Sequence, residues 1–395
     1  MNFLTAEMAR MSTSDMSVVQ RRVVYICDWL PPDFGAVGQY AALSARELAD
    51  QGLAVTLVGL TSGESTLDPA QRVGQGTIEI IRVHRPTYDK QSFRSRIIWT
   101  VFSNLLLLRA AFAALRRADV VIFTGSPPLM LHFIAPLNLL LRKQLIYRIS
   151  DFYPECFIAA QGQRGLLLGL LLCWTNFWRR RIDTFEVLGM DQARRLAEYG
   201  IAETRIHLSR YQSPVTVPPG LAALSVPREL QGQDGVILYS GNWGVAHDED
   251  TFIEAYTGYR QQSKCGLALW LNAVGAKADR VETALRSRGL PVYRSRLVPL
   301  ADLPKLLLAA DVHLITLHDA FVGYVVPSKV HACIESGKRI LFVGSQDSDV
   351  HLLASSALPA SKYYRVDVGN VAALVDALHT MEYAIMNERR PGFVA

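Results

Sequence analysis

Short runs of β-branched and other apolar residues recur along the first 210 residues, and longer stretches with helical periodicity separate them. A continuous apolar run is typical of a strand buried on both faces, whereas apolar residues spaced three and four apart are typical of an amphipathic helix. The alternation predicts a parallel sheet with crossover helices. Strands are expected at 23–27, 54–60, 78–83, 119–124, 144–149 and 184–188, and helices at 38–51, 93–117, 129–142, 165–181 and 191–199.

The alternation stops at residues 211–233, which contain four prolines, two glycines and no sustained periodicity. Such a composition is typical of a linker between domains. The same alternation then restarts and continues almost to the end of the chain. Strands are expected near 236–239, 267–272, 312–316, 340–343 and 364–367, and helices near 248–262, 277–287, 303–309, 328–335 and 371–387.

The length of 395 residues exceeds what one hydrophobic core usually supports, so the pattern predicts two domains of the α/β class. We expect two Rossmann-like, doubly wound halves that face each other across a cleft. The expected boundaries are a disordered N-terminal tail at 1–17, a first domain at 18–210, a linker at 211–233 and a second domain at 234–375. Residues 376–395 would form a C-terminal helix or tail that packs back on the first domain.

Composition narrows the class of partner. The net charge is only +5, and no dense tract of basic residues with interleaved aromatics is present, so nucleic acid is not an expected ligand. The five cysteines are scattered and form no Cys-x-x-Cys pair, which argues against both a disulfide framework and a zinc site. The acidic clusters at 248–250 and 347–349 are interpreted as helix starts. We therefore expect a cytoplasmic protein that holds no metal.

Three apolar stretches in the first half bear on membrane association: 97–108, 129–141 and 166–178. Each is shorter than the roughly 18 to 20 residues that a spanning helix requires. In the third, leucines lead to Trp174, Phe177 and Trp178 and then to three arginines at 179–181. Indoles followed by cations are typical of a segment at a lipid interface, so residues 165–181 are predicted to contact the inner face of the cytoplasmic membrane. A crossover helix buried on the sheet is the alternative.

Two glycine-containing turns follow predicted strands and mark the candidate site. The strand at 23–27 leads to Gly35, Gly38 and Gln39, and the strand at 236–239 leads to Gly241 and Asn242. Glycine lets the backbone turn tightly and approach a ligand, and the helix that follows directs its positive end at the same point. Two such turns predict one ligand site in each half.

The order of the motifs resembles the GT-B glycosyltransferases of family 4, in particular their bacterial O-antigen and exopolysaccharide branch. The sequence Tyr-Ser-Gly-Asn-Trp-Gly at 239–244 and the sequence Pro-Ser-Lys at 327–329 resemble the two segments that bracket the nucleotide-sugar diphosphate in that family. The first half adds Pro-Pro at 31–32, Ser-Pro-Pro at 126–128 and Asp-Phe-Tyr-Pro-Glu at 151–155. The resemblance spans nearly the whole chain and implies a GT-B fold.

The resemblance also implies roles for single residues. Gly241, Asn242, Ser328 and Lys329 would hold the donor, with Lys329 as the cation on its diphosphate. The first-domain loop with Gly35, Gly38 and Gln39 would face the donor across the cleft, and Asp151 would orient the acceptor or be a satisfied carboxylate at a strand end.

The chain departs from the family pattern at several positions. The usual Arg and Lys after the first glycine are replaced by Asn242 and His247, the usual Glu by Ala332, and the His of a His-Asp pair by Ser150. We expect a protonated His247 to supply charge beside Lys329, and Glu335 is the nearest acid that could contact the ribose.

The resemblance implies a retaining transferase that moves a sugar from a UDP- or GDP-linked donor to a lipid-linked or growing polysaccharide acceptor, with no cofactor and no metal. Two alternatives stay open. A nucleotide-sugar 2-epimerase shares the architecture, and a catalytically silent GT-B subunit would explain the lost donor contacts.

Overall fold

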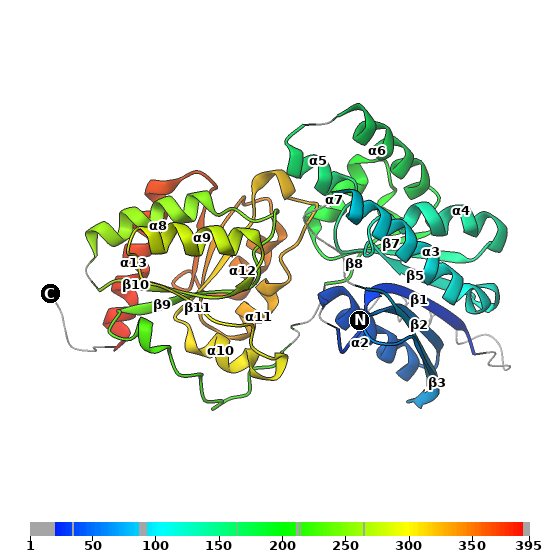
Figure 1. The fold of residues 1–395 in the computed structure, drawn as a ribbon, viewed down its shortest axis with the longest axis horizontal. Coiled ribbons are helices and arrows are strands. Elements are labelled where there is room, and N and C mark those ends of the chain that lie inside the picture. Colours follow the sequence, from blue (N-terminus) through cyan, green and yellow to red (C-terminus); the bar gives the residue numbers. More distant parts are fainter. Residues whose placement is uncertain are drawn as a thin grey trace. The chain divides into compact units, whose positions relative to one another are not determined.

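The computed structural model describes residues 20–33, 35–86, 93–163, 165–210, 213, 215–263 and 265–389 (Figure 1). The predicted tail at 1–17 and the last residues of the predicted C-terminal tail, 390–395, lie outside the described residues. The chain divides into two compact units after Arg210, the residue at which the sequence analysis ends the first domain.

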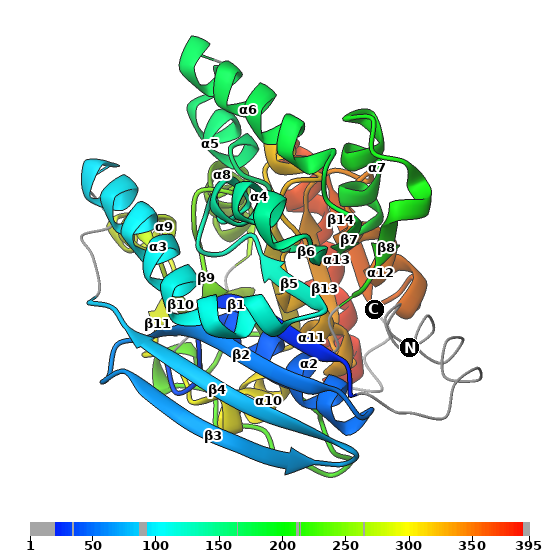
Figure 2. The ribbon, with the colours of Figure 1, turned by 90° about the vertical axis from the view of Figure 1, so that its right-hand side faces the viewer.

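The N-terminal unit contains an eight-stranded sheet in the order β3-β4-β2-β1-β5-β6-β7-β8. All neighbouring strands run parallel except β3, which pairs antiparallel with β4 at the edge of the sheet (Figure 2). The strands are β1 (Arg22–Trp29), β2 (Ala54–Thr61), β3 (Thr66–Val73), β4 (Gly76–His84), β5 (Val120–Thr124), β6 (Gln144–Ile149), β7 (Thr184–Val187) and β8 (Ile206–Leu208).

Helices cover both faces of this sheet. They are α2 (Ala36–Asp50), α3 (Phe93–Arg117), α4 (Leu131–Leu141), α5 (Glu155–Gln161), α6 (Leu166–Arg179) and α7 (Met190–Glu198). Side chains alternate between the faces of a strand, and Val23 and Tyr25 of β1 pack in one cluster with Ala41 and Leu48 of α2. The crossover from β1 to β2 runs one way along the sheet, and the crossovers to β5, β6 and β7 run the other way. Because crossovers are right-handed, α3, α4 and α6 lie on the face of the sheet opposite to α2 (Figure 1).

The C-terminal unit contains a six-stranded, fully parallel sheet in the order β11-β10-β9-β12-β13-β14. Its strands are β9 (Gly235–Asn242), β10 (Leu267–Val274), β11 (Val292–Arg294), β12 (Val312–Thr316), β13 (Arg339–Val343) and β14 (Tyr363–Val366). Its helices are α8 (Asp250–Gln262), α9 (Ala276–Ser287), α10 (Leu303–Ala309), α11 (Lys329–Glu335), α12 (Asp349–Ala357) and α13 (Val371–Arg389).

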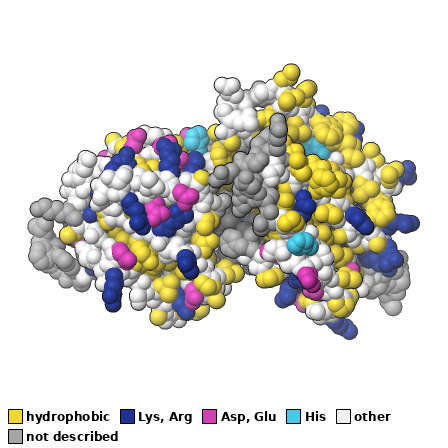
Figure 3. Space-filling model, in the orientation of Figure 1, with side chains coloured by type: hydrophobic (Ala, Val, Ile, Leu, Met, Phe, Trp, Pro, Cys, Tyr) yellow, Lys and Arg dark blue, Asp and Glu magenta, His cyan; other side chains and the backbone are white. Residues whose placement is uncertain are grey.

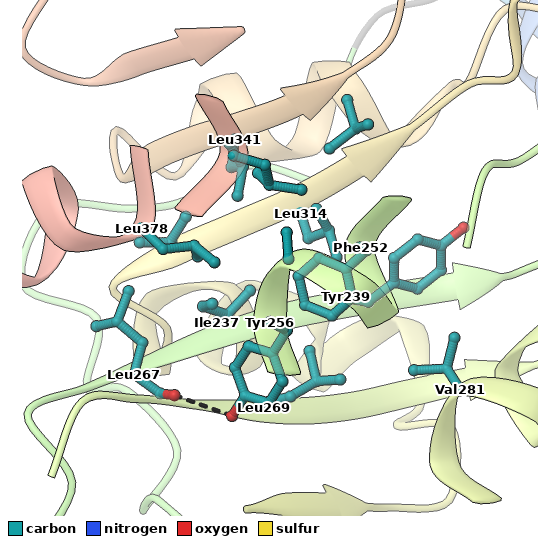
Figure 4. Close-up of a cluster of buried hydrophobic side chains, with 14 of the residues drawn as sticks. Ile237, Tyr239, Phe252, Tyr256, Leu267, Leu269, Val281, Leu314, Leu341 and Leu378 are labelled. Carbon is teal, nitrogen blue, oxygen red and sulfur yellow. Dashed lines mark hydrogen bonds between the residues drawn. The ribbon is translucent and has the colours of Figure 1, made fainter. Parts of the chain in front are cut away.

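The C-terminal core joins β9, β10, β12 and β13 to α8, α9 and α13 (Figure 4). Within it, the Tyr256 hydroxyl donates to the Leu267 carbonyl at 2.9 Å, so the one polar atom of that ring is paired (Figure 4). Leu378 and Ile385 of α13 belong to the same cluster. The described part of α13 therefore belongs to the core of the C-terminal unit, and the expectation that residues 376–395 pack back on the first domain stays a prediction.

The proline-rich stretch at 211–233 was expected to be a linker. Val215 and Leu230 within it are buried against β9, β10 and α10, where their apolar side chains complete that side of the C-terminal sheet. The apolar stretch starting at 97 was expected to be too short to span a membrane. By length and composition alone, Ile97–Arg117 is long enough, since Arg109 interrupts the apolar pattern without ending it.

The doubly wound architecture was otherwise predictable, and the helix at 93–117 and the strand at 144–149 match the expected bounds. The strands β3, β8 and β11 were missed. Most residues of β3 are exposed at the sheet edge, so its sequence lacks the apolar run that marks a buried strand.

A buried ion pair ties four elements of the N-terminal unit together. Arg148 of β6 binds Glu186 of β7, and both side chains are at most 5% exposed. The Nη1 group of Arg148 also donates to the Tyr25 hydroxyl of β1 at 3.0 Å and to the Ser44 hydroxyl of α2 at 2.9 Å. Removing one partner would leave the other charge buried without compensation.

We predict that Arg148→Met lowers the free energy of unfolding of the chain by about 3 to 5 kcal/mol, because Glu186 loses its cation. The double variant Arg148→Met, Glu186→Gln should recover part of the loss. Urea unfolding followed by circular dichroism measures both. The exposed pair of Arg195 and Glu198, 2.9 Å apart, supplies the control, and Arg195→Met should cost about 0 to 1 kcal/mol. Equal losses for both single variants would contradict the prediction.

Candidate functional site

The strand order of the C-terminal unit fixes where a ligand can bind. The chain adds β10 and β11 on one side of β9 and then crosses to place β12 on the other side. In open α/β sheets, ligands bind outside the carboxyl ends of the strands at such a reversal. β9 and β12 pair at Ile237 and Leu238, and β9 then continues to Asn242. The predicted Gly241 turn therefore leaves β9 at the reversal point.

The turn after β9 is held in place by one buried residue, and the residues before it are accessible. Trp243 is fully buried, and its backbone amide donates to the Val274 carbonyl at 2.8 Å. Gly241 has φ of +112°, a conformation that side-chain-bearing residues rarely adopt, and a Cβ there would meet no atom within 4 Å. Asn242, the next residue, is exposed. The turn thus leaves backbone and an amide side chain accessible at the carboxyl end of β9.

Lys329 lies beside this turn, as the sequence predicted, at the first residue of α11. Its Nζ is buried and makes no hydrogen bond within the described part of the chain. The Nζ lies 3.4 Å from the centre of the Tyr239 ring, while the Trp243 ring stacks on Tyr239 at 3.8 Å. Both distances can hold only if cation and indole occupy opposite faces of the tyrosine ring. The Lys329 ammonium therefore packs against the face of the Tyr239 ring that Trp243 leaves free.

The environment of Lys329 disfavours its charged form. Burial lowers the pKa of Lys329 from 10.5 to about 7, and the nearby Cys333 opposes this effect only in part. A buried cation with no anionic partner is unstable unless a ligand supplies the negative charge. The arrangement suits an anion that binds at the carboxyl end of β9.

His247 does not carry the charge that the sequence analysis assigned to it. It is buried, and its Nδ1 faces the Thr316 carbonyl at the end of β12, which favours the tautomer with the proton on Nδ1. Burial, followed by the positive charge of Lys329, lowers the pKa of His247 to about 3. His247 is neutral at pH 7, and its ring links the β9 turn to the Thr316 carbonyl of β12.

A second lysine near the site, Lys277, was not predicted because it lies on α9, outside the two motifs of the sequence analysis. Lys277 of α9 donates to the His247 carbonyl at 2.5 Å and forms an ion pair of 2.7 Å with Glu249. Arg280 also pairs with Glu249 at 2.7 Å. Lys277 therefore fixes the loop that contains His247, and its charge is already matched by a carboxylate.

The remaining predicted donor residues differ in placement. Ser328 precedes Lys329 as the N-cap residue of α11. Glu335 is the last residue of the same helix and is exposed. Glu335 is six positions after Lys329, which corresponds to a rise of about 9 Å, so the two side chains leave the helix at opposite ends. The structure brings Lys329, His247 and the Gly241 turn together but does not bring Glu335 to them.

The N-terminal unit has its own reversal point, between β1 and β5. Asp28, near the end of β1, accepts a hydrogen bond of 2.6 Å from Ser126, which follows β5. Burial raises the pKa of Asp28 to about 6 against the opposing hydrogen bond from Ser126. Burial and the charge of Asp28 likewise raise the pKa of Asp151, after β6, to about 6. The predicted Asp151 thus belongs to a carboxylate pair at this edge.

Asp28 was missed because a single acid after a strand has no distinctive sequence pattern. Its position beside β5 follows only from the strand order, since 98 residues separate it from its partner Ser126. Gly125 brings the adjoining loop close, because a Cβ there would lie 2.9 Å from the Asp151 carbonyl. The signal available in the sequence was the placement of Asp28 and Asp151 at the ends of two predicted parallel strands.

Packing within the N-terminal unit explains part of the need for glycine in the first turn. A Cβ at Gly38 would lie 1.7 Å from the Trp29 carbonyl, so the close packing of α2 on the end of β1 requires glycine there. Gly35 is the N-cap residue of α2, and Gln39 lies in its first turn. Their role toward a donor stays a prediction.

Among the described residues, no group of three or more His, Cys, Asp or Glu side chains is arranged to hold a metal ion. The two acidic clusters of the sequence analysis lie at helix starts, as predicted: α8 begins at Asp250 and α12 at Asp349. Ser348 caps α12 by accepting from the Val350 amide.

No protein-family model matches the chain. A Pseudomonas aeruginosa protein described as a probable glycosyltransferase, WbjE, is 22% identical over 338 residues, which cover 83% of this chain and 82% of that protein. This identity is low, but the match extends over most of both chains.

Solved structures with similar folds cover nearly the whole chain. A UDP-forming α,α-trehalose-phosphate synthase from Burkholderia xenovorans in complex with glucose-6-phosphate has a TM-score of 0.61 at 11% identity, covering 94% of this chain and 97% of that one. WaaG, a glycosyltransferase of lipopolysaccharide biosynthesis, has a TM-score of 0.59 at 14% identity, covering 92% of each chain. HepE from Anabaena, in complex with UDP, has a TM-score of 0.54 at 11% identity, covering 94% and 95%.

These similarities confirm the predicted fold. The chain has the two-domain α/β architecture of GT-B glycosyltransferases, with a mainly parallel sheet in each unit.

We predict that Lys329→Met stabilises the ligand-free protein at pH 7, on the order of 2 kcal/mol, because it removes a buried ammonium that the folded state disfavours. The folded pKa of Lys329, about 7, lies below the unfolded value of 10.5, so the penalty is full below pH 7 and disappears as pH rises toward 10.5. Urea unfolding at pH 7 and pH 9.5 should show the difference shrink.

The control for this prediction is Lys305→Met, since Lys305 is 42% exposed and pairs with Asp302. It should change stability by less than about 1 kcal/mol at either pH. A Lys329→Met variant that is less stable than the wild type at pH 7 would show that the ammonium is satisfied in the free protein.

We predict the opposite pH trend for Asp28→Asn. The folded pKa of Asp28, about 6, lies above the unfolded value of 3.8, so ionising the buried group costs stability above pH 6 and nothing below pH 3.8. The amide keeps a partner for Ser126 and carries no charge. The variant should therefore be more stable than the wild type at pH 7.5 by about 1 to 3 kcal/mol, with a smaller gain at pH 4.5. A loss at pH 7.5 would contradict this account of Asp28.

Proposed function

We propose that the chain is a glycosyltransferase that moves a sugar from a nucleotide-diphosphate donor to a lipid-linked or growing cell-surface polysaccharide acceptor. The observation that carries the proposal is the buried Nζ of Lys329 at the reversal point of the C-terminal sheet, which makes no hydrogen bond to any residue that the structure describes. The similarity to WbjE along most of the chain supports a transferase, and the similarity to WaaG supports a role in polysaccharide synthesis.

In this proposal the donor diphosphate binds where the Gly241 turn meets α11. Backbone N–H groups of the turn, the Asn242 amide and Ser328 would contact its oxygens, and Lys329 would neutralise the negative charge that grows as the sugar departs. The complex of HepE with UDP is consistent with a UDP-linked donor, and a GDP-linked donor stays possible on the same chemistry. Asp28 and Asp151 of the N-terminal unit would contact the acceptor.

The proposal also includes the family-4 assignment, retention of anomeric configuration and independence of metal. The leaving phosphate would remove the proton from the incoming hydroxyl on the same face of the sugar, so that no protein nucleophile is required. Neutral His247 would serve to position the β9 turn against β12, through its contact with Thr316. The protein would act in the cytoplasm, peripherally bound at the inner face of the cytoplasmic membrane through residues 165–181.

We predict that Lys329→Ala weakens UDP or GDP binding or slows sugar transfer by about 10- to 150-fold, the equivalent of losing a charged contact of about 1.5 to 3 kcal/mol. Calorimetric titration with UDP, GDP and their sugars identifies the nucleotide, and incorporation of labelled sugar into lipid-extractable product from a membrane extract measures transfer. Lys305→Ala is the matched control, because Lys305 lies in the same unit away from the β9 turn and already pairs with Asp302.

The same titration separates the alternatives. A transferase binds one nucleotide and slowly hydrolyses its sugar, whereas a 2-epimerase interconverts the sugars without acceptor. A silent subunit does neither. Unchanged turnover in Lys329→Ala would remove Lys329 from the site.

A further inference from the structure

Large apolar side chains are exposed on three helices of the N-terminal unit. Leu140 of α4 and Leu166 and Leu167 of α6 are each at least 80% exposed. Soluble proteins rarely leave contiguous apolar patches of this kind open to water. The further exposed apolar residues on these helices are Ile97, Ile98, Phe102, Leu105 and Phe112 of α3, Leu139 of α4, and Leu170, Trp174 and Phe177 of α6.

These residues form stripes along the helices. On α3, residues 98, 102, 105, 109, 112 and 116 follow one another at intervals of four and three, which places them on one side of the helix. On α6, residues 167, 170, 174 and 177 do the same, and Arg181 lies just after the end of the helix. The opposite side of α3 carries Leu107, Ala111 and Leu115, which are fully buried in the unit. Each helix therefore packs inward with one side and exposes an apolar side.

The three helices are neighbours. α4 packs against both α3 and α6, and all three cover the same face of the N-terminal sheet (Figure 1). Hydrophobic side chains gather over this part of the N-terminal unit, with Lys and Arg side chains nearby (Figure 3). We name the exposed side of α3, α4 and α6 the apolar helix face.

The charge on the apolar helix face has a single sign. The segments 93–118, 129–144 and 165–182 contain no Asp or Glu. Arg109 lies within the apolar stripe of α3, and further basic residues lie at or just after the C-terminal ends of all three helices. The arginines among these residues have no ion pair within the described residues. These basic residues are Arg109, Arg116, Arg117, Arg142, Lys143, Arg180 and Arg181.

The combination fits a lipid surface that carries negative charge. Apolar side chains can enter the acyl boundary while arginines at the helix ends reach phosphate groups. The Arg181 guanidinium lies 3.6 Å from the centre of the Phe177 ring, so an aromatic ring and a cation already lie together at the end of α6. Specific protein interfaces tend to be depleted of unpaired charge at their core, but they usually include both signs at the rim.

α3 lies on this surface and does not cross the bilayer. Although Ile97–Arg117 is long enough by composition, its inward side includes the buried polar residues Ser103 and Asn104. The Asn104 amide donates to the Pro128 carbonyl at 2.9 Å, outside its own helix. Spanning would break this bond and strip the sheet of its cover.

We infer that the apolar helix face, with α3 and α4 as full members beside α6, docks on an anionic phospholipid bilayer. The inference deepens the membrane location included in the proposed function. Vesicle binding is measured without donor or acceptor, so a failure here can be told apart from a failure of glycosyl transfer.

The test is co-sedimentation of the full-length protein with vesicles of phosphatidylcholine, with and without one third phosphatidylglycerol. The wild type should bind the anionic vesicles and bind neutral vesicles more weakly. Leu166→Ser with Leu167→Ser, and separately Ile98→Ser with Phe102→Ser, should each reduce partition at least about tenfold. Arg116→Ser with Arg117→Ser should reduce binding to anionic vesicles by roughly tenfold or more and leave binding to neutral vesicles unchanged.

The control is Leu300→Ser with Tyr383→Ser, two exposed apolar residues of the C-terminal unit that should not change partition. Trp174 is the most exposed of the six tryptophans, and its emission should shift to the blue on anionic vesicles, a shift that Trp174→Phe removes. All substituted side chains are exposed, and thermal melts followed by circular dichroism check that each variant folds.

Three results would overturn the inference. The first is a wild type that sediments with neither vesicle. The second is an α3 variant that binds like the wild type while the α6 variant does not, which would leave α6 alone at the membrane. The third is a wild type that forms a dimer, seen by light scattering, and binds no vesicles. The same variants would then dissociate the dimer.

Discussion

The reversal of strand order in each parallel sheet is the constraint on which the rest of the structure depends. Successive right-handed crossovers in one direction along the sheet place all their helices on the same face. After β10 and β11 the chain therefore crosses back over β9 and adds β12 on its other side, and the helices between β11 and β14 cover the second face. The loops after β9 and β12 then leave the sheet next to each other. Lys329 meets His247 and the Gly241 turn for this reason, although about 80 to 90 residues separate it from them along the chain.

The same constraint operates in the N-terminal unit, where β1 and β5 are the reversal strands. Asp28 and Ser126 are joined by a hydrogen bond across it. The two units thus carry different chemistry at equivalent places in their sheets. One has a lysine that pairs with no carboxylate among the described residues, and the other has a pair of carboxylates with raised pKa values.

The sequence allowed prediction of what depends on local pattern. The alternation of apolar runs and helical stripes predicted nearly all buried strands, and glycine and Pro-Ser-Lys motifs pointed to Lys329. Burial of individual polar groups could not be predicted in the same way. His247 was expected to be protonated because its position resembles that of a lysine, yet its contact with Thr316 and the nearness of Lys329 depend on tertiary packing. Asp28, Lys277 and the support of Lys329 by Tyr239 were missed for the same reason.

The position of Lys329, with its Nζ buried against the Tyr239 ring, affects how the site responds to an anion. With a pKa of about 7, this side chain is near the midpoint of its titration in neutral solution. A diphosphate that binds beside Nζ favours the ammonium, so binding would draw a proton from the solvent. The measured heat of binding would then include the ionisation heat of the buffer, and affinity for polyanions would fall in alkaline medium.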